Sequence, residues 1–334
     1  MKILYIYRHP DLGYSIGKVF NSIENEMSKY ADVVDSVYLP VSNYSIRGLW
    51  ANIRYVQKQL KKNNYDIVHI TGTEHYLIPF LLGHKVVITV HDLGRLSNLN
   101  WIRRCRYWLM QVAVLKFANA ITCISSKTFC EVLGEISIKK ERMIVIPNPI
   151  DNKLNSFYKE FNFYCPTILH IGTKPNKNLS RTIIALKDIK CKLRIVGKVN
   201  KSDFDLLQVH NIDYSIVCDL SDEDILQEYK NADIINFPSY YEGFGMPIIE
   251  GQAIGRLVIT SNIEPMVSVA GDGAILCDPF DVESIRNAYL KGINDKNYRD
   301  NIIKLGVENV KKYSLESITK QYFQLYNRVL NVSN

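Results

Sequence analysis

Short apolar runs alternate with segments of helical periodicity along the whole chain. The first half contains six runs rich in Val, Ile and Tyr, at 2–7, 33–39, 66–71, 85–91, 120–126 and 143–148. Strands that are apolar at nearly every position are typical of sheets covered on both faces. Their alternation with helix-length segments predicts a parallel α/β sheet.

The same pattern starts again in the second half. Six further apolar runs lie at 167–172, 192–197, 214–220, 233–239, 256–262 and 273–278. Prolines and polar residues interrupt the periodicity over 147–165, where we place a linker. We therefore predict two α/β domains, 1–152 and 153–313. An amphipathic helix over 314–331 follows the cap signal of Ser314, and we expect it to pack back on the first domain.

Length and composition agree with two globular domains. The chain has 334 residues, 47% of them hydrophobic and 22% charged, which is too long for one ordinary core. Since no segment offers about 18 uncharged apolar residues, we expect neither a signal peptide nor a membrane span, and a cytoplasmic protein. Seven cysteines without a C-x-x-C pair are typical of reduced core thiols rather than disulfides or a zinc site.

The net charge of +7 is concentrated in the first domain. Lys and Arg outnumber Asp and Glu within residues 1–160, whereas the two signs nearly balance afterwards. A basic domain can face an anionic ligand or an anionic membrane surface, although most of these lysines are explained by a solvated surface. We expect no nucleic-acid partner. Because many functions share this architecture, the function must be argued from particular residues.

The most informative segment is 237–255, which has the form of a loop followed by the start of a helix. Gly243 and Gly245 permit unusual backbone angles and the close approach of a ligand, and Pro247 suits a first helical turn. The backbone N–H groups of such a turn favour an anion. The segment therefore predicts a binding site for a negatively charged group.

Two carboxylates flank this turn, Glu242 in the loop and Glu250 about one turn into the helix. Each can accept hydrogen bonds from a pair of sugar hydroxyls. Taken separately, an acid near a helix start complements the helix dipole, and a glycine makes a turn. The combination is more specific than its parts.

The segment resembles the signature E-G-F-G-x-P-x-x-E of the large family of retaining glycosyltransferases known as family four, which includes bacterial mannosyl-, glucosyl- and N-acetylglucosaminyltransferases. The matching residues are Glu242, Gly243, Phe244, Gly245, Pro247 and Glu250. The resemblance implies the GT-B fold, two Rossmann-like doubly wound domains facing across a cleft, and a UDP- or GDP-sugar as donor. It also implies that Glu242 and the Gly243–Met246 backbone hold the donor sugar and phosphate, and that Glu250 binds the ribose.

A second segment, 170–183, combines a strand, a glycine turn and a helix start, where N–H groups and a lysine can hold a diphosphate. We predict Lys177 as the phosphate ligand, against the alternative of a solvated surface lysine. Where family members carry an arginine, this chain has Thr173 and Asn176, which leaves open whether Lys174 supplies a second cation. The predicted donor ligands of this loop are Gly172, Thr173, Lys174 and Lys177.

The first domain contributes residues that follow its strands. His91 ends the run 85–91, and Asp92 follows it. His91 is similar to the family's strand-end histidine that faces the donor sugar, and Asp92 to its neighbour on the acceptor side. The alternative is that a histidine at a strand end is only a satisfied polar residue. After the first strand, Gly13 and Tyr14 resemble the loop that approaches the donor phosphates and the acceptor. The likeness runs over almost the whole chain.

The chemistry implied by the resemblance needs no metal and no cofactor. Lys177 and a helix N-terminus stabilise the departing phosphate, and Glu242 and His91 complete the predicted catalytic set. The competing design is an Asp-x-Asp metal site, present here as Asp203–Asp205 and Asp222–Asp224. Each pair follows a serine and opens a helical segment, so N-capping explains it better.

The segment 101–118 bears on the identity of the acceptor. The segment 101–118 reads as an amphipathic helix packed on the core. Alternatively, its Trp and Arg side chains contact the inner membrane leaflet and bring the site to a polyprenyl-diphosphate-linked acceptor in O-antigen or capsule synthesis. These side chains are Trp101, Arg103, Arg104, Arg106 and Trp108.

Other functions remain as alternatives. A nucleotide-sugar epimerase of the same fold has the donor but no acceptor. A non-catalytic nucleotide-sugar-binding protein would bind without turnover. A dinucleotide dehydrogenase is disfavoured because no G-x-G-x-x-G follows a strand.

Overall fold

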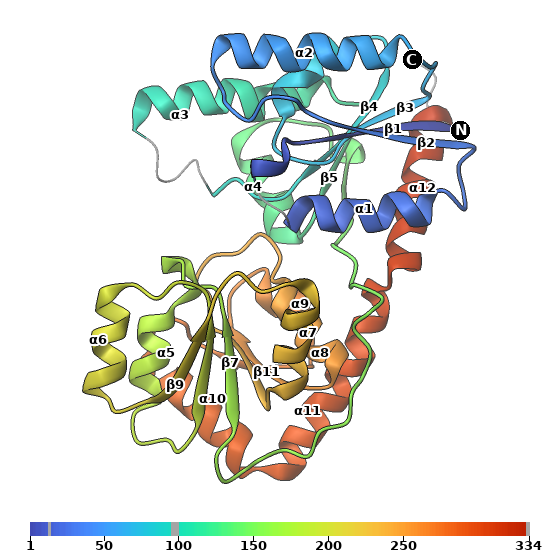
Figure 1. The fold of residues 1–334 in the computed structure, drawn as a ribbon. Coiled ribbons are helices and arrows are strands. Elements are labelled where there is room, and N and C mark those ends of the chain that lie inside the picture. The colour runs from blue at the N-terminus through green and yellow to red at the C-terminus, as the bar shows by residue number, and fades with distance from the viewer. Residues whose placement is uncertain (13–14, 95–99, 332–334) are drawn as a thin grey trace. The chain divides into compact units, whose positions relative to one another are not determined.

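The computed structural model describes residues 1–12, 15–94 and 100–331 (Figure 1). The chain forms two compact units. Unit 1 comprises residues 1–149 together with the chain from Leu315 onward, and unit 2 comprises Ile150–Ser314. The division after Pro149 lies close to the predicted division after residue 152.

Unit 1 is built on a six-stranded parallel sheet in the order β2-β1-β3-β4-β5-β6. Its strands are β1 (Lys2–Tyr7), β2 (Val33–Tyr38), β3 (Ile67–Ile70), β4 (Lys85–Val90), β5 (Ala120–Cys123) and β6 (Met143–Val145). Each apolar run of the first half forms one of these strands, which confirms the predicted parallel architecture. The strands are apolar throughout because both faces of the sheet are covered.

Helices cover the two faces of this sheet (Figure 1). One face carries α1 (Ser15–Met27) and α12 (Leu315–Asn331), and the other carries α2 (Ile46–Leu60), η2 (His75–Phe80) and α4 (Ser126–Glu135). Neighbouring residues of β1 serve opposite faces because side chains alternate along a strand. Tyr5 packs in the cluster with α12, and Leu4 in the cluster with α2.

The terminal helix belongs to the core of unit 1. The Tyr326 hydroxyl lies 2.6 Å from Nδ1 of His69 and 3.1 Å from the hydroxyl of Tyr5. Nε2 of His69 lies 2.9 Å from the hydroxyl of Thr89. Burial lowers the pKa of His69 to about 3, so this imidazole is neutral at pH 7. A neutral, fully partnered histidine therefore links β3, β4 and α12.

Unit 2 repeats the design with a parallel sheet in the order β12-β11-β10-β7-β8-β9. Its strands are β7 (Thr167–Ile171), β8 (Lys192–Val196), β9 (Asp213–Val217), β10 (Ile234–Phe237), β11 (Leu257–Ser261) and β12 (Ile275–Cys277). Its helices are α5 (Leu179–Ala185), α6 (Lys201–Val209), α7 (Asp222–Asn231), α8 (Met246–Ile254), α9 (Met266–Ala270), α10 (Val282–Asn294) and α11 (Lys296–Asn309). Shorter 3-10 turns are η1 (Pro10–Leu12) and η6 (Lys140–Arg142) in unit 1, and η7 (Pro175–Lys177) and η8 (Val310–Tyr313) in unit 2.

The strand order of unit 2 reverses direction between β7 and β10. From β7 the chain proceeds to β8 and β9 on one side, and then returns to place β10 on the other side of β7. In open parallel sheets, a ligand crevice forms at the carboxyl ends of the two strands that flank such a reversal. The loops after β7 and β10 therefore mark the expected ligand site of this unit.

The segment 101–118 differs from the single amphipathic helix that was predicted. It begins as α3 (Trp101–Tyr107), widens to a π-helical turn over Trp108–Val112 and ends as a 3-10 turn over Ala113–Phe117. The residues from 107 to 115 are almost continuously apolar, so no single stripe of period 3.6 selects one regular helix. None of the described helices is long and apolar enough to cross a membrane.

One predicted helix cap is confirmed and another is wrong. Ser221 caps α7 and forms a capping box with Asp224. In α6, however, the cap is Asn200 rather than Ser202, because the helix already begins at Lys201. The cysteines are free, as predicted, but Cys105 and Cys130 are exposed rather than in the core.

Candidate active site

Two loops of unit 2 meet at the reversal in strand order. The loop after β7 contains η7 and ends at Asn178, and the loop after β10 runs from Pro238 to the start of α8. The backbone N–H of Tyr240 donates to the carbonyl of Asn176 at 3.1 Å. Asn176 Nδ2 in turn donates to the carbonyl of Tyr241 at 2.9 Å. These contacts hold the two predicted segments side by side.

Lys177 and Glu242 form the centre of this site. Nζ of Lys177 lies 2.7 Å from Oε1 of Glu242, and Asn176 Nδ2 donates to the same oxygen at 3.1 Å. Both side chains of the ion pair are mostly buried, with exposed fractions of 19% for the lysine and 15% for the glutamate. The ammonium group also lies 4.5 Å from the centre of the Phe237 ring. Lys177 is therefore a fixed cation and not a solvated surface lysine.

The glycines of the two loops allow this close packing. Gly172 has φ of +89°, and a Cβ there would lie 3.2 Å from Cγ and Cε of Lys177. Gly245 has φ of +107°, and a Cβ there would lie 3.0 Å from Cδ1 of Ile248. Both positions thus require glycine. Gly243 forms a bend in the same loop.

Helix α8 starts directly at the site, as predicted. Gly245 is its N-cap, Met246 is its first residue and Pro247 lies in the first turn. The N–H of Ile248 bonds back to the carbonyl of Gly245, while the N–H at the first helical position has no acceptor within the helix. The Phe244 side chain is buried against the ring of Tyr313, so only its backbone can serve a ligand.

Glu250 lies further along α8 and is held by a buried tyrosine. The hydroxyl of Tyr229, on α7, donates to Oε2 of Glu250 at 2.5 Å. Burial and the carboxylate raise the pKa of Tyr229 well above its ordinary value, so the hydroxyl remains a donor at every physiological pH. This hydrogen bond fixes the orientation of the carboxyl group, which is half-buried.

Thr173 and Lys174 occupy the turn between β7 and η7. The hydroxyl of Thr173 donates to the carbonyl of Lys198 at 2.7 Å, which joins this turn to the end of β8. Lys174 is exposed and precedes η7, where its carbonyl accepts from the N–H of Lys177. The structure therefore brings Lys174 into the same loop as Lys177 but not into the ion pair with Glu242.

In unit 1, His91 follows β4 at the carboxyl edge of the sheet. Its Nε2 donates to the carbonyl of Thr71 at 2.8 Å, which leaves Nδ1 as the acceptor. Burial lowers the pKa of His91 to about 4, so the ring is neutral at pH 7. Asp92 is exposed and accepts from the N–H of Gly94 at 3.1 Å. Gly13 and Tyr14 lie outside the described residues.

One acid of each Asp-x-Asp pair has structural partners. Asp203 is buried and accepts from Ser180 and Asn200, and Asp224 accepts from the Ser221 hydroxyl in the capping box. Among the described residues, no group of three or more His, Cys, Asp or Glu side chains is placed to hold a metal ion. These acids serve the ends of α6 and α7.

Sequence reasoning missed two residues that organise the site. Asn176 was noted only as a replacement for a family arginine, yet it contacts both Tyr241 and Glu242. Tyr229 lies in the middle of an ordinary helical pattern and gave no signal, although a tyrosine on a buried helical face needs a polar partner. That partner is Glu250.

Comparison with known proteins places both units in one family. The model described as "Glycosyl transferases group 1" matches residues 166–308, and the model described as "Glycosyltransferase Family 4" matches residues 19–154. The chain is 35% identical over 105 residues to O-antigen chain mannosyltransferase B of Escherichia coli, a match that covers 31% of this chain and 28% of that protein. The chain spans about a third of the length of the first curated relatives that it matches.

Solved structures agree over the full length. Sucrose-phosphate synthase of Thermosynechococcus elongatus superposes with a TM-score of 0.83 at 19% identity, covering 100% of both chains. Anabaena HepE in complex with UDP and glucose superposes with a TM-score of 0.81 at 14% identity, covering 98% of this chain and 100% of that one. These likenesses establish the GT-B fold predicted from the sequence. With its two Rossmann-like units and the two family models matching most of its length, the chain belongs to the group 1 glycosyltransferases of family four.

Proposed function

We propose that the chain transfers a glycosyl group from a nucleotide-diphosphate sugar to an acceptor hydroxyl, with retention of anomeric configuration and without a metal ion. The observation that carries this proposal is the Lys177–Glu242 pair at the strand reversal of unit 2. A buried cation beside a helix N-terminus suits a diphosphate, and a fixed carboxylate beside it suits sugar hydroxyls. Both groups sit at the carboxyl ends of β7 and β10, where open sheets bind ligands.

The reaction requires stabilisation of a departing phosphate. As the bond from the anomeric carbon to the phosphate oxygen breaks, its electron pair passes to that oxygen. The acceptor oxygen bonds to the anomeric carbon on the same face, and its proton passes to the phosphate. Lys177 and the N–H of Met246 stabilise the negative charge that develops, which is the role a divalent cation has in other designs. No side chain is needed as general base.

The remaining roles follow from position. Glu242 binds hydroxyls of the donor sugar. Among the described residues, the hydrogen bonds to its carboxylate are both accepted by Oε1, so Oε2 is left for a ligand. Glu250, oriented by Tyr229, binds the ribose hydroxyls. In unit 1, His91 is neutral and its Nδ1 accepts from a sugar hydroxyl without adding charge, with Asp92 on the acceptor side.

The acceptor is proposed to be a glycan or a polyprenyl-diphosphate-linked sugar of surface polysaccharide synthesis, as in O-antigen or capsule. The support for this acceptor is the similarity to an O-antigen mannosyltransferase. The UDP bound in the solved HepE structure favours a nucleotide-sugar donor. We place the protein in the cytoplasm, in contact with the inner leaflet through α3. Trp101 and Ile102 of α3 have exposed fractions of 78% and 71%, beside three arginines.

The membrane contact is tested by flotation with anionic vesicles at low salt. Wild-type protein should float, and Trp101→Ser should reduce the floating fraction severalfold, because a buried interfacial Trp contributes a large apolar area. Tyr158→Ser is the matched control, since this aromatic residue of unit 2 is 88% exposed. Flotation that is equal for all three proteins contradicts the assignment to α3.

The transfer itself is tested by incubating the protein with a nucleotide sugar and a lipid-linked or glycan acceptor. The coupling constant of the product's anomeric proton reports the configuration. A product with the donor's anomeric configuration supports the proposal, and an inverted product refutes the mechanism. Release of an altered nucleotide sugar without any acceptor identifies an epimerase instead.

A further inference from the structure

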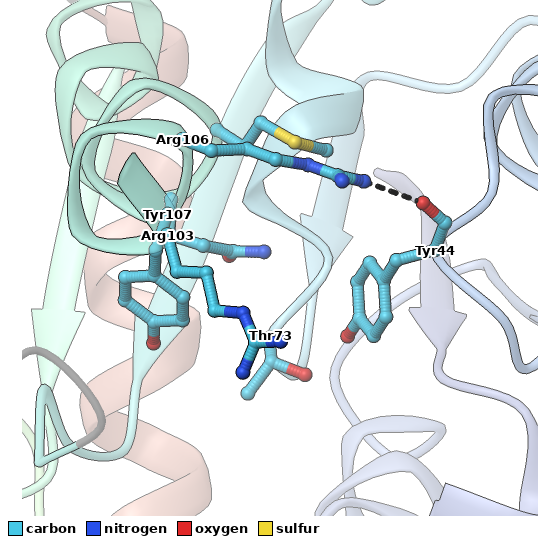
Figure 2. Close-up of a pocket in the computed structure, with 7 residues that line it drawn as sticks. Tyr44, Thr73, Arg103, Arg106 and Tyr107 are labelled. Carbon is cyan, nitrogen blue, oxygen red and sulfur yellow. Dashed lines mark hydrogen bonds between the residues drawn. The ribbon is translucent and has the colours of Figure 1, made fainter. Parts of the chain in front are cut away.

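Unit 1 contains a pocket of about 460 Å³ whose lining residues take no part in the donor site proposed above (Figure 2). Its wall is formed on one side by α3 and the π-helical turn, which contribute Arg103, Arg106 and Gln111. The opposite side comes from the loops that follow β2 and β3, which contribute Tyr44 and Thr73. The pocket therefore lies where the carboxyl edge of the sheet meets α3.

The charged side chains that line the pocket are cations. Within the described part of the chain, two guanidinium groups line it and no carboxylate does. The hydroxyl of Thr73, which also lines it, donates to the buried carboxylate of Glu74 at 3.1 Å. Nη2 of Arg106 donates to the carbonyl of Tyr44 at 2.7 Å, which anchors that arginine across the opening. Figure 2 shows the Arg103 side chain extending from the helix toward Thr73, with no hydrogen bond drawn to any residue of the pocket. The neighbouring Arg104 lies instead 3.8 Å from Glu135.

A buried polar side chain also lines the pocket. Gln111 is 5% exposed, and its Oε1 has no hydrogen-bond partner within the described part of the chain. An amide oxygen buried without a donor is costly, and a turn of the carboxamide that brought this oxygen to a ligand hydroxyl in the pocket would recover the cost. The pocket thus combines two cations for an anion with an unsatisfied acceptor for a hydroxyl.

The pocket is larger than an isolated anion would need. A volume of about 460 Å³ is in the range of small-molecule sites and leaves room for a sugar beside a phosphate. Figure 2 shows the rings of Tyr44 and Tyr107 at opposite sides of the Arg103 guanidinium, where an aromatic face can pack on the apolar side of a sugar ring. Arginine forks match phosphate oxygens in pairs.

We propose that this pocket binds a sugar together with its attached phosphate, so that the acceptor is a glycosyl phosphate or diphosphate rather than a neutral glycan. Arg103 and Arg106 bind the phosphate, and Gln111 accepts from a sugar hydroxyl. Calling this ligand the acceptor rests on the proposed function. The evidence for a binding site is the pocket itself.

The chain offers a separate reporter for each site. Met110 lines the pocket, and Met246 begins α8 at the donor site. With 13C-labelled methionine methyl groups, the chain gives six signals, which Met110→Leu and Met246→Leu assign. The probes are N-acetylglucosamine 1-phosphate, its neutral methyl glycoside, inorganic pyrophosphate and a farnesyl-diphosphate-linked N-acetylglucosamine, each titrated alone and with saturating UDP or GDP.

The sugar phosphate should shift the Met110 signal saturably, and the neutral glycoside should bind at least about tenfold more weakly. Arg103→Gln should weaken binding of the sugar phosphate by about ten- to a hundredfold. Arg103→Lys should weaken it by less, because lysine keeps the charge but lacks the paired N–H donors of the guanidinium group. Arg104→Gln is the matched control and should stay within about twofold. If the farnesyl-diphosphate-linked sugar binds more tightly than the sugar phosphate, the acceptor is lipid-linked. If the two bind equally, the acceptor is a phosphorylated glycan.

The proposal is overturned if Met110 does not respond to any phosphate probe, or if Arg103→Gln and Arg104→Gln weaken binding equally, which would indicate only diffuse attraction. Tighter binding of pyrophosphate than of the sugar phosphate would remove the sugar from the proposal. The Met246 signal tests the proposed function separately, because nucleoside diphosphates should shift it whether or not the pocket is occupied. A Met246 signal that does not respond to UDP or GDP would count against the proposed function and not against the pocket.

Discussion

Nζ of Lys177 lies 2.7 Å from Oε1 of Glu242, although the two residues are 65 positions apart in the chain. They meet because β7 and β10 are neighbours in the sheet while β8 and β9 lie on the far side of β7. The topology therefore converts two separate loops into one charged site. A pair this well buried holds its partners in a fixed geometry before a substrate arrives, which is what electrostatic catalysis requires.

Lys177→Ala is expected to lower kcat for glycosyl transfer by about a hundredfold, or about 3 kcal/mol, because it removes one donor to the departing phosphate. The measurement is steady-state transfer with donor and acceptor both varied. Lys174→Ala is the control from the same loop, since this exposed lysine is outside the ion pair. A larger loss for Lys174→Ala would show that the wrong lysine was assigned to the phosphate.

Gly245→Ala is expected to destabilise unit 2 by about 1–3 kcal/mol, because φ of +107° and a Cβ 3.0 Å from Ile248 are both unfavourable. Gly134→Ala is the matched control. This glycine lies in α4, and a Cβ there meets nothing within 4 Å, so alanine should stabilise by a few tenths to about 1 kcal/mol. Urea unfolding of both variants gives the comparison, and equal effects of the same sign would contradict the described loop.

Stability is expected to fall in acid because unit 1 buries neutral histidines. Burial lowers the pKa of His69 to about 3 and that of His91 to about 4, whereas the unfolded chain takes up these protons near 6.5. The contribution of each ring is complete above pH 6.5 and is lost as the pH falls below it, by about 1.4 kcal/mol per pH unit.

The unfolding free energy measured between pH 4 and 7 checks this expectation. The variant His69→Gln should be less stable at pH 7, because Tyr326 and Thr89 lose a partner, but should depend less steeply on pH. A slope unchanged by the substitution would mean that His69 is protonated in the folded protein.

Transfer is expected to persist in excess EDTA, because Lys177 and the start of α8 occupy the place of a metal in the proposed mechanism. Asp224→Asn, which weakens the capping box of α7, should cost about 1 kcal/mol of stability and leave kcat nearly unchanged. Loss of activity in EDTA that Mg²⁺ or Mn²⁺ restores, together with a large fall in kcat for Asp224→Asn, would favour the Asp-x-Asp alternative.

The sequence predicts the strands well because a doubly covered parallel sheet leaves a strong signal. The runs at 2–7 and 167–172 are apolar at nearly every position, and they form β1 and β7 with little change of boundary. The segment 101–118 was predicted less well, since its run of apolar residues fits several helical windings and only packing decides among them. Strand order is absent from such patterns, so the contact of Lys177 with Glu242 could not be derived from residue spacing.

The same limit applies to the site residues. Gly245 and Pro247 carry a local signal, a turn followed by a helix start, and the structure places them there. Asn176 and Tyr229 carry none, because an amide or a phenol takes its role from whichever polar partner the fold brings near it. Contacts of this kind depend on tertiary packing and are visible only in the structure.

The central claim is that the loops after β7 and β10 bind a nucleotide-diphosphate sugar, and thermal unfolding in the presence of a panel of UDP- and GDP-sugars tests it most directly. One member at a hundred times its dissociation constant should stabilise the wild-type protein by about 2.7 kcal/mol, and Glu250→Ala and Lys177→Ala should each need a higher concentration for the same effect. If no nucleotide sugar protects the wild type, or if protection is unchanged in both variants, the site has been assigned to the wrong residues.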